Sequence, residues 1–438
     1  MFKTIANAWK LPDLRKKMLF TLFIVFIFRI GSVIPVPFLD VHALKSLTAG
    51  LSGGESMLAY FDLFSGGAFS NATLFAMSVT PYINSSIIMQ LLSVAIPPLE
   101  RLTKEGVEGR KKIATITRYV TVLLGIIQGT AYYIWLLRSN IVEYQGWSFE
   151  GVFTAIVIIL AFTAGTALMM WLGEQINQNG VGNGISILLF VGIIARIPVT
   201  FRTLWETFKA GLEGDTAKII YPIVFVILFL VIIWVIVFMN DAERRIPVQY
   251  AKRVVGRKMY GGQSTYLPIK VGLSGVMPII FASSILSIPS TILLFIGEEN
   301  VTSDFWKGFF KAFTMGGWIY IGLYFLLIIG FAYFYVTIQY NPIEMSNNLR
   351  QNNGTIKGIR PGKPTTDYIA KILSKITLIG ALFLAFIAIV PLIYSNVTNM
   401  RGLMMGGTSV IILVGVALDT MKQIESQMMM RNYKGFLD

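Results

Sequence analysis

Charged residues inside apolar segments would be the first candidates for chemistry in this chain, and they are scarce. Only Arg29 lies deep within an apolar run, while Glu174 and Asp419 stand at the ends of such runs. A proton- or sodium-coupled transporter normally places a carboxylate near the middle of the membrane, and an intramembrane aspartyl protease needs two. Neither requirement is met. Arg29 either extends outward along its flexible stem or pairs within the protein, and the sequence leaves both options open.

Residues that bind metals or act as nucleophiles are almost absent. The 438 residues include no cysteine and one histidine, His42. This excludes disulfides, thiolate nucleophiles and cysteine-ligated clusters, and it argues against a histidine-rich metal site or a Ser-His-Asp triad. The glycine run GVGNGIS at 180–186 follows no strand and precedes no lysine, so it predicts a tight turn before a helix and not a phosphate loop. We expect no catalytic residue, no metal and no cofactor.

The composition is typical of a membrane protein. Hydrophobic residues make up 55% of the chain and charged residues only 14%, which does not fit a soluble surface. Apolar runs of spanning length, about 20 residues each, predict an all-α polytopic fold with ten transmembrane helices. The predicted spans cover about 18–36, 75–96, 118–137, 152–172, 184–200, 219–239, 273–296, 314–336, 372–394 and 403–418.

Basic residues are divided unevenly between the two sides of the predicted membrane. With the N-terminus inside, 27 of the 37 Lys and Arg residues fall on the inner side and nine on the outer side. The acidic residues divide almost evenly. By the positive-inside rule, both termini face the cytoplasm. The basic N-terminal segment precedes an apolar run that is too long for a cleavable signal peptide, so we expect a retained first span.

The ten predicted spans divide into two groups of five near residues 201–218. An odd number of spans per group means that the second half enters the membrane from the opposite side, as in an inverted repeat. The expected halves are 1–205 and 206–438. Ten helices without internal symmetry are the alternative, because the two halves share no evident sequence similarity.

Polar residues are concentrated around the second and seventh spans. The segment DLFSGGAFSNATLFAM at 62–77 is too short and too rich in Gly, Ser and Asn to cross a bilayer, so it is either a re-entrant half-helix or a surface loop. The second span carries five polar groups beside an aliphatic stripe, and the seventh carries four serines and two prolines. Such groups also serve as ordinary contacts between helices. The residues are Val79, Thr80, Ile83, Asn84, Ser85, Ser86, Ile87 and Gln90, and Ser274, Pro278, Ser283, Ser284, Ser287 and Pro289.

The two longest inner loops, at about 240–271 and 337–371, are the most basic stretches of the chain. Positive inner loops are expected in any membrane protein. At about 30 residues each, however, they exceed what a connection needs. We therefore expect a surface that docks a partner of acidic or nucleic-acid character.

At these residues the sequence resembles the SecY family, the large subunits of the Sec protein-conducting channel. The resemblance extends from one end of the chain to the other. The matching stretches, in family order, are FRIGSVIPVP, FSGGAFSNATLFAMSVTPYINSSIIMQLL, GEQINQNGVGNGISILLF, ERRIPVQYAKR, SGVMPIIFASSI, GIRPGKPT and GGTSVIILVGVALD.

The resemblance implies an hourglass pore between the two halves that passes unfolded secretory polypeptides and releases apolar segments sideways into lipid. It implies a plug half-helix at about 62–73, with Phe64, Ser65, Gly66, Gly67, Ala68, Phe69 and Ser70. A ring of aliphatic side chains falls on Val79, Ile83, Ile185, Leu189, Ile280 and Ile412. A lateral gate between the second and seventh spans falls on Asn84, Ile87, Gln90, Ser283, Ser284, Ser287 and Ile288.

The resemblance also implies partners. These are the small membrane subunits SecE and SecG, the SecA ATPase, the ribosome, signal sequences and nascent or secretory polypeptides, and membrane lipids. The channel itself is then not an enzyme, and the location implied is the bacterial plasma membrane. The implied docking residues are Arg244, Arg245, Lys252, Arg253, Arg257, Lys258 and Arg360.

Two other classes of function stand beside this interpretation. A secondary transporter of small solutes is also built from inverted repeats and broken helices, but it needs a polar site at mid-membrane. A membrane enzyme needs paired carboxylates, metal ligands or an activated nucleophile. The sequence offers none of these groups in a suitable pattern.

Overall fold

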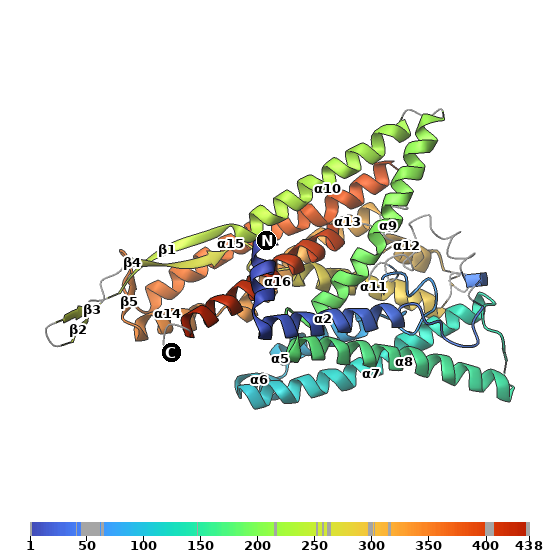
Figure 1. The fold of residues 1–438 in the computed structure, drawn as a ribbon, viewed down its shortest axis with the longest axis horizontal. Coiled ribbons are helices and arrows are strands. Elements are labelled where there is room, and N and C mark those ends of the chain that lie inside the picture. The colour runs from blue at the N-terminus through green and yellow to red at the C-terminus, as the bar shows by residue number, and fades with distance from the viewer. Residues whose placement is uncertain are drawn as a thin grey trace.

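The computed structural model describes residues 2–40, 42–44, 62, 65–146, 148–213, 217–250, 253–255, 258–260, 264–296, 301, 303–313, 317–398 and 407–434. Within these ranges the chain is mostly helical (Figure 1). The helices are α1 (Phe2–Lys10), α2 (Pro12–Gly31), α5 (Thr80–Ala95), α6 (Pro97–Lys104), α7 (Val107–Arg138), α8 (Phe149–Asn179), α9 (Gly184–Leu212), α10 (Ala217–Asp241), α11 (Met277–Ile296), α12 (Asp304–Ala312), α13 (Trp318–Gln339), α14 (Pro342–Gln351), α15 (Lys363–Thr398) and α16 (Gly407–Lys434). The strands are β1 (Glu243–Tyr250), β2 (Arg253–Val255), β3 (Lys258–Tyr260), β4 (Ser264–Lys270) and β5 (Gly354–Ile356).

Most of these helices have the length and composition of membrane spans. Among the described residues, seven are long and apolar enough to cross a bilayer, and the bent pair α5 and α6 makes an eighth. The bend between α5 and α6 is 106° and lies at Ile96, directly before two prolines. The other two predicted spans correspond to α2, whose first turns are charged, and to α11, which is the shorter apolar helix. The chain is therefore a multi-pass membrane protein.

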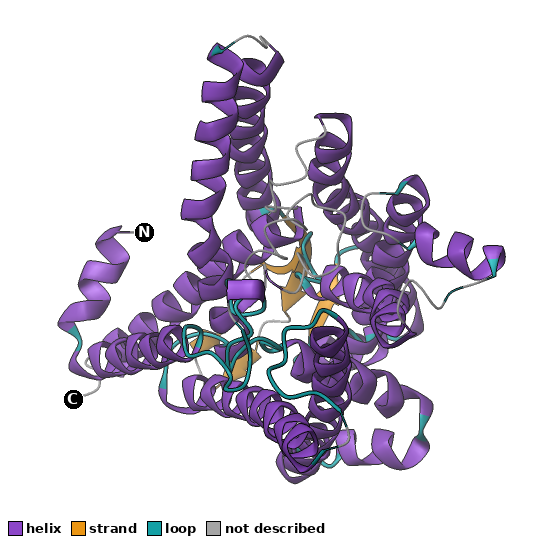
Figure 2. Cartoon of the chain, turned by 90° about the vertical axis from the view of Figure 1, so that its right-hand side faces the viewer, coloured by secondary structure: helices purple, strands orange, loops and turns teal. Residues whose placement is uncertain are grey.

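The long helices form two groups (Figure 1). In one group, α5, α7 and α8 pack in series beside α2, and in the other α11, α13, α15 and α16 pack together with α10. Helix α9 contacts α8 of the first group and α10 and α16 of the second. The half boundary expected at 205 falls inside α9, which continues to Leu212. Figure 2 looks along the helices and shows the strands between and behind them.

The two long inner loops are not irregular, because they add a small sheet to the all-α membrane part. Strand β1 pairs antiparallel with β4 on one side and with β5 on the other, so residues from both loops form one three-stranded sheet. Ile246 and Val248 alternate with exposed residues along β1 and are themselves about 1% exposed. This period of two is typical of a strand with one buried face. The buried face packs on α14 and the start of α15 through Leu349 and Ile369.

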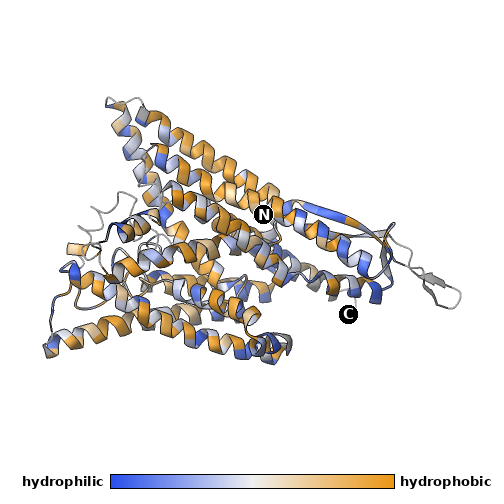
Figure 3. Ribbon diagram, turned by 180° about the vertical axis from the view of Figure 1, so that it is seen from behind, coloured by the Kyte–Doolittle hydropathy of each residue, from blue (hydrophilic) through white to orange (hydrophobic). Residues whose placement is uncertain are grey.

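Hydropathy separates the membrane part from the sheet (Figure 3). Hydrophobic residues follow the long helices, whereas the extension that carries the sheet is largely hydrophilic. The sheet is continuous with the membrane helices, because α10 leads into its central strand β1 and the edge strand β4 leads through residues 271–276 into α11.

Candidate functional site

Six aliphatic side chains from four different elements meet in one hydrophobic cluster between the helices. Three are fully buried members of the cluster and three are half-buried and pack against it. We call these six residues the aliphatic collar: Val79, Ile83, Ile185, Leu189, Ile280 and Ile412. The pore ring that the resemblance implies for these six residues stays a prediction.

Each member of the aliphatic collar lies at or near the start of a helix. Val79 is the residue before α5, and Pro81 in the first turn supplies a fixed φ and needs no hydrogen-bond partner there. The side chain of Asn183 caps α9 by accepting a hydrogen bond from the Ser186 backbone N–H at 3.3 Å. The glycine run before α9 is thus the tight turn that its sequence predicts, with φ of +86° at Gly182. It places Ile185 in the first turn of α9.

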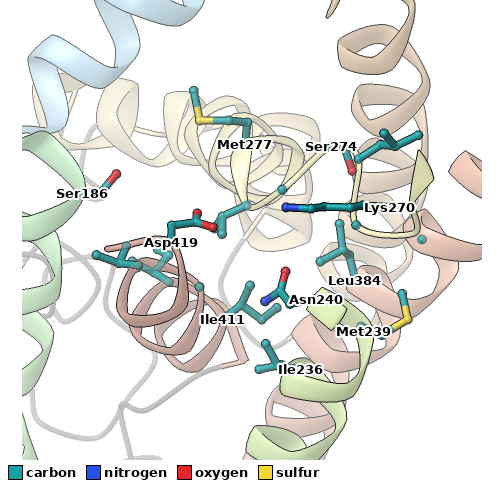
Figure 4. Close-up of a pocket in the computed structure, with 18 of the residues that line it drawn as sticks. Ser186, Ile236, Met239, Asn240, Lys270, Ser274, Met277, Leu384, Ile411 and Asp419 are labelled. Carbon is teal, nitrogen blue, oxygen red and sulfur yellow. The ribbon is translucent and has the colours of Figure 1, made fainter. Parts of the chain in front are cut away.

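A cavity of about 500 Å³ adjoins the aliphatic collar on the side of the sheet. Leu189, Ile280 and Ile412 line it at the collar, whereas Lys270 and Asp419 line it nearer the sheet. Figure 4 shows the side chains of Lys270 and Asp419 pointing into the same space. The cavity is therefore apolar at the collar and polar toward the sheet, as expected of a water-filled entrance that narrows to a dry constriction.

On one wall of this cavity, Lys422 of α16 contacts the end of α10. The ammonium of Lys422 donates to the Asn240 carbonyl at 3.3 Å and pairs with the Asp241 carboxylate at 3.1 Å. Cations are favourable at the C-terminus of a helix, where the last carbonyls are unpaired. This contact holds the two helices together at the point where β1 begins.

Of the predicted plug at about 62–73, Asp62 and Ser65 are helical and the residues that follow are turns. Helical conformation ends at Ser65, and residues 66–79 are turns that contain one isolated bridge. Gly66 and Gly67 have φ of +66° and +94°, and Ala72 has +43°, values that interrupt an α-helix. A Cβ on Gly66 would lie 3.1 Å from the backbone of Gly192, so the segment packs directly against α9. Phe64 lies outside the described residues.

The plug segment is held by polar contacts to three helices. Asp62 forms an ion pair with Arg196 of α9 and accepts a hydrogen bond from the Ser70 backbone N–H at 2.8 Å. The Tyr132 hydroxyl of α7 donates to the Phe69 carbonyl at 2.7 Å. The Arg29 guanidinium of α2 lies 3.5 Å from the Gly66 carbonyl, so the structure favours pairing within the protein for this residue.

The predicted gate residues lie on two helices that touch. α11 contacts both α5 and α7. Within α11 the hydroxyls of Ser283 and Ser287 donate to carbonyls of their own helix, at 2.9 and 2.7 Å. On α5, the side-chain oxygen of Asn84 is buried and has no partner among the described residues. Asn84 on α5 therefore carries a buried polar atom that lacks a hydrogen-bond partner in this state.

The remaining gate residues differ in their exposure. Ile87 is buried and Ser284 and Gln90 are half-buried, whereas Ile288 is 51% exposed. Ser85, the residue after Asn84, donates to the Thr117 carbonyl of α7 at 2.7 Å. The α5 helix is thus hydrogen-bonded to α7, and it also contacts α11.

Comparisons with known proteins agree with this arrangement. The SecY family model matches residues 73–421. The protein translocase subunit SecY of Mycobacterium tuberculosis is 44% identical over 451 residues, and that of Bacillus subtilis is 42% identical over 445 residues, with full coverage of both chains in each case. This chain belongs to the SecY family.

Solved structures show the SecY fold in the same way. A structure described as a protein conducting channel superposes with a TM-score of 0.61 at 16% identity and 96% coverage of both chains. A SecY structure concerned with its plug domain gives 0.64 at 16% identity, and Sec61 from a canine ribosome-channel complex gives 0.58 at 16% identity, each with 96% coverage of both chains. As a SecY-family member, the chain is a subunit of a protein-conducting channel and not an enzyme.

The predicted docking residues of this SecY-family chain are placed on and near the sheet. Arg244 and Arg245 are exposed on β1, and Arg245 pairs with Glu243 at 2.6 Å. The backbones of Arg253 and Lys258 belong to β2 and β3. Lys252 and Arg257 lie outside the described residues.

Arg360 differs from the other predicted docking residues because hydrogen bonds fix the turn on which it lies. Its side chain is exposed, while its carbonyl accepts a hydrogen bond from the Thr365 hydroxyl at 2.8 Å. Gly358 and Gly362 on either side have φ of +82° and +101°, a conformation that glycine adopts without strain. The hydroxyl of Ser346 on α14 donates to the Gly362 carbonyl at 3.2 Å. The guanidinium therefore projects from a backbone of defined shape.

Sequence reasoning does not single out every residue that the structure brings to this SecY-type channel. In the sequence, Arg196 is counted among the outer basic residues. In the structure it forms an ion pair with Asp62. Two features of the sequence could have indicated this ion pair: a basic residue within an apolar helix, and one acidic residue at the start of the glycine-rich segment. Tyr132 gives no such signal, because an aromatic residue in a span is ordinary.

Proposed function

We propose that this chain is the central subunit of a translocase in a bacterial plasma membrane, and that polypeptides pass through its aliphatic collar. The observation that carries the proposal is the meeting of six aliphatic side chains from α9, α11, α16 and the start of α5 beside a cavity that is polar toward the sheet. The plug segment, with Ala68 buried in the same cluster, closes the outer side in this state.

The chemistry of the collar suits a substrate that varies in sequence. A passing polypeptide presents every kind of side chain, and a pore lined by fixed charges or donors would hold some segments too tightly. Aliphatic groups bind none of them strongly. A narrow apolar constriction also disfavours a continuous column of water, which limits ion leakage when the channel is idle.

The α5–α11 seam is the proposed exit into lipid. Apolar segments of about 20 residues are more stable in the bilayer than in water, so a seam that opens sideways lets partitioning choose between secretion and membrane insertion. Separation of α5 from α11 would let water or a substrate donate a hydrogen bond to the buried oxygen of Asn84. This hydrogen bond would offset part of the free energy that separating the apolar side chains of the seam costs.

The proposed topology has ten spans in two inverted halves, with both termini in the cytoplasm. The positive-inside distribution supports this orientation. The packing of α1 on α16, with a hydrogen bond of 3.3 Å between Thr4 and Glu425, supports termini on the same side. The sheet then lies in the cytoplasm, where Arg244, Arg245 and Arg360 are available to a partner.

Because the channel makes and breaks no bond, the energy for transport must come from that partner. We propose SecA or a translating ribosome at the sheet, and SecE and SecG as small subunits in the membrane. A related fold occurs in structures described as ribosome-channel complexes, including an idle yeast Ssh1 complex bound to the 80S ribosome. Signal sequences and nascent or secretory polypeptides are the proposed substrates.

Flux through reconstituted vesicles tests the proposal. Vesicles that hold the purified channel complex should import an unfolded secretory polypeptide when SecA and ATP are supplied, and should not import amino acids or sugars. Vesicles without the channel complex are the control. Import of small solutes under an ion gradient, without import of polypeptide, would show that the chain is a solute transporter.

A further inference from the structure

A short helix outside the spans carries a surface that the channel function does not use. Helix α12 (Asp304–Ala312, DFWKGFFKA) stands between α11 and α13 and contacts both. It begins eight residues after the end of α11 and ends six residues before α13 starts. These short connections to two membrane helices hold α12 close to the level at which the spans leave the bilayer.

The two faces of α12 are chemically different. At about 100° per residue, all its aromatic positions fall within one arc of about 140°. These positions are Phe305, Trp306, Phe309, Phe310 and the following Phe313. Lys307 and Lys311 lie one turn apart on the opposite side, beside Asp304. The helix therefore has one aromatic face and one face with a net positive charge.

The aromatic face is anchored to the protein at one end and open at the other. Phe310 is 8% exposed, and Phe313 packs against the core of the second helix group. Phe305 and Trp306 are 73% and 52% exposed, although their rings contact each other at 5.6 Å between centroids, and Phe309 is 37% exposed. Three large aromatic side chains exposed together on one side are unusual for a surface in water.

The neighbouring surface suggests what covers this open face. Trp318 and Ile319, in the first turn of α13, are 70% and 61% exposed at the end of a membrane span. Tryptophan is enriched where a span meets the headgroup region, because its ring is apolar and its N–H is polar. The open aromatic face of α12 is thus continuous along the chain with a surface that faces lipid.

We propose that α12 lies in the interface of the outer leaflet. The side chains of Phe305, Trp306 and Phe309 insert at the boundary of the acyl chains, and Lys307 and Lys311 bind the phosphates of anionic lipid headgroups. An amphipathic helix with aromatic residues on one face and lysines on the other is the kind of segment that binds such a surface. The outer location rests on the proposed orientation of the chain.

Spin labels in this naturally cysteine-free chain provide the test. The full chain with its partner subunits, as Phe305→Cys or Gly308→Cys, would carry a nitroxide in vesicles of phosphatidylcholine with or without phosphatidylglycerol. Gly308 is the matched control, because it lies on the charged face and a Cβ there meets nothing within 4 Å. We expect the label at 305 to collide more often with oxygen than with a water-soluble nickel complex, and the label at 308 to show the reverse.

The lipid dependence tests the second half of the proposal. Phosphatidylglycerol should increase the depth of the label at 305 in the otherwise unchanged chain, and Lys307→Gln with Lys311→Gln should abolish that increase. A label at 305 as accessible to nickel as the one at 308 would place α12 in water and overturn the proposal. A deep label that does not respond to phosphatidylglycerol would overturn the binding of anionic lipid.

Discussion

At the residue scale, the ion pair of Asp62 and Arg196 is one of the polar contacts that hold the proposed plug segment against α9. The Asp62 side chain is 7% exposed and that of Arg196 19%, so both charges have lost most of their water. Arg196 also leaves its Nε buried without a partner among the described residues. Removing one partner of such a pair leaves an uncompensated charge, at a cost of about 3–5 kcal/mol.

Double substitution separates the ion pair from the packing around it. Asp62→Ala and Arg196→Ala should each loosen the closed state and raise the ion conductance of the idle channel in planar bilayers. The ion leak of the double variant should be smaller than the sum of the increases in the two single variants, because no buried charge is then left unpaired. Strictly additive leaks would mean that the two residues do not act as a pair.

The aliphatic collar makes a second prediction at this scale. Ile412 is 2% exposed among apolar neighbours, and Ile412→Asn should admit water to the constriction. We expect a higher ion leak and the passage of secretory proteins that carry defective signal sequences. Ile412→Leu keeps the volume and the apolar character, and it should behave like the unchanged chain. The collar assignment fails if Ile412→Asn changes neither ion leak nor signal stringency.

At the element scale, the helices could be predicted from sequence and the plug and sheet could not. Apolar runs locate ten helices because a bilayer demands the same length and composition of each. The plug segment is too short for that signal, and the positive φ of Gly66 occurs where the segment packs against Gly192 of α9. The sheet is not predicted because β1 offers only two buried positions, Ile246 and Val248, in a loop whose composition is dominated by basic residues.

A disulfide across the seam tests the gate. Asn84→Cys with Ile288→Cys should cross-link α5 to α11, because disulfide formation needs Cα atoms within about 7 Å. The oxidised channel should then stop releasing apolar segments into lipid, and reduction should restore release. Ser85→Cys with Ile288→Cys is the matched control, since Ser85 faces α7 and should not cross-link. Undiminished lateral release from the cross-linked channel would place the exit elsewhere.

At the scale of the whole molecule, the sheet joins two loops that are far apart in the sequence. The Thr355 hydroxyl of β5 donates to the Gln249 carbonyl of β1, across 106 positions of the chain. Charge and length predict a docking surface on both loops, but neither feature predicts that they pair, because strand pairing is non-local. The pairing places Arg360 on the same extension as Arg244 and Arg245.

A charge reversal distinguishes a specific docking contact from bulk charge. A guanidinium on a defined turn can bind a partner's carboxylate or phosphate through two hydrogen bonds. Arg360→Glu should therefore insert normally and keep its partner subunits, yet lose SecA-driven transport far more than Lys363→Glu. The two residues are three positions apart, and each substitution changes the charge equally. Equal, modest losses in the two variants would mean that the loop supplies only general positive charge.

Capture of a polypeptide in transit tests the central claim most directly. A secretory chain stalled halfway by a folded domain at its end would carry one cysteine in its middle, and the channel would carry one at Ile83, at Ile412 or at Val231. Val231 is the control, because it is 53% exposed on α10 and lies outside the aliphatic collar. We predict disulfides to the stalled chain at 83 and 412 and none at 231. Equal cross-linking at all three positions, or cross-linking at 231 alone, would contradict passage through the collar.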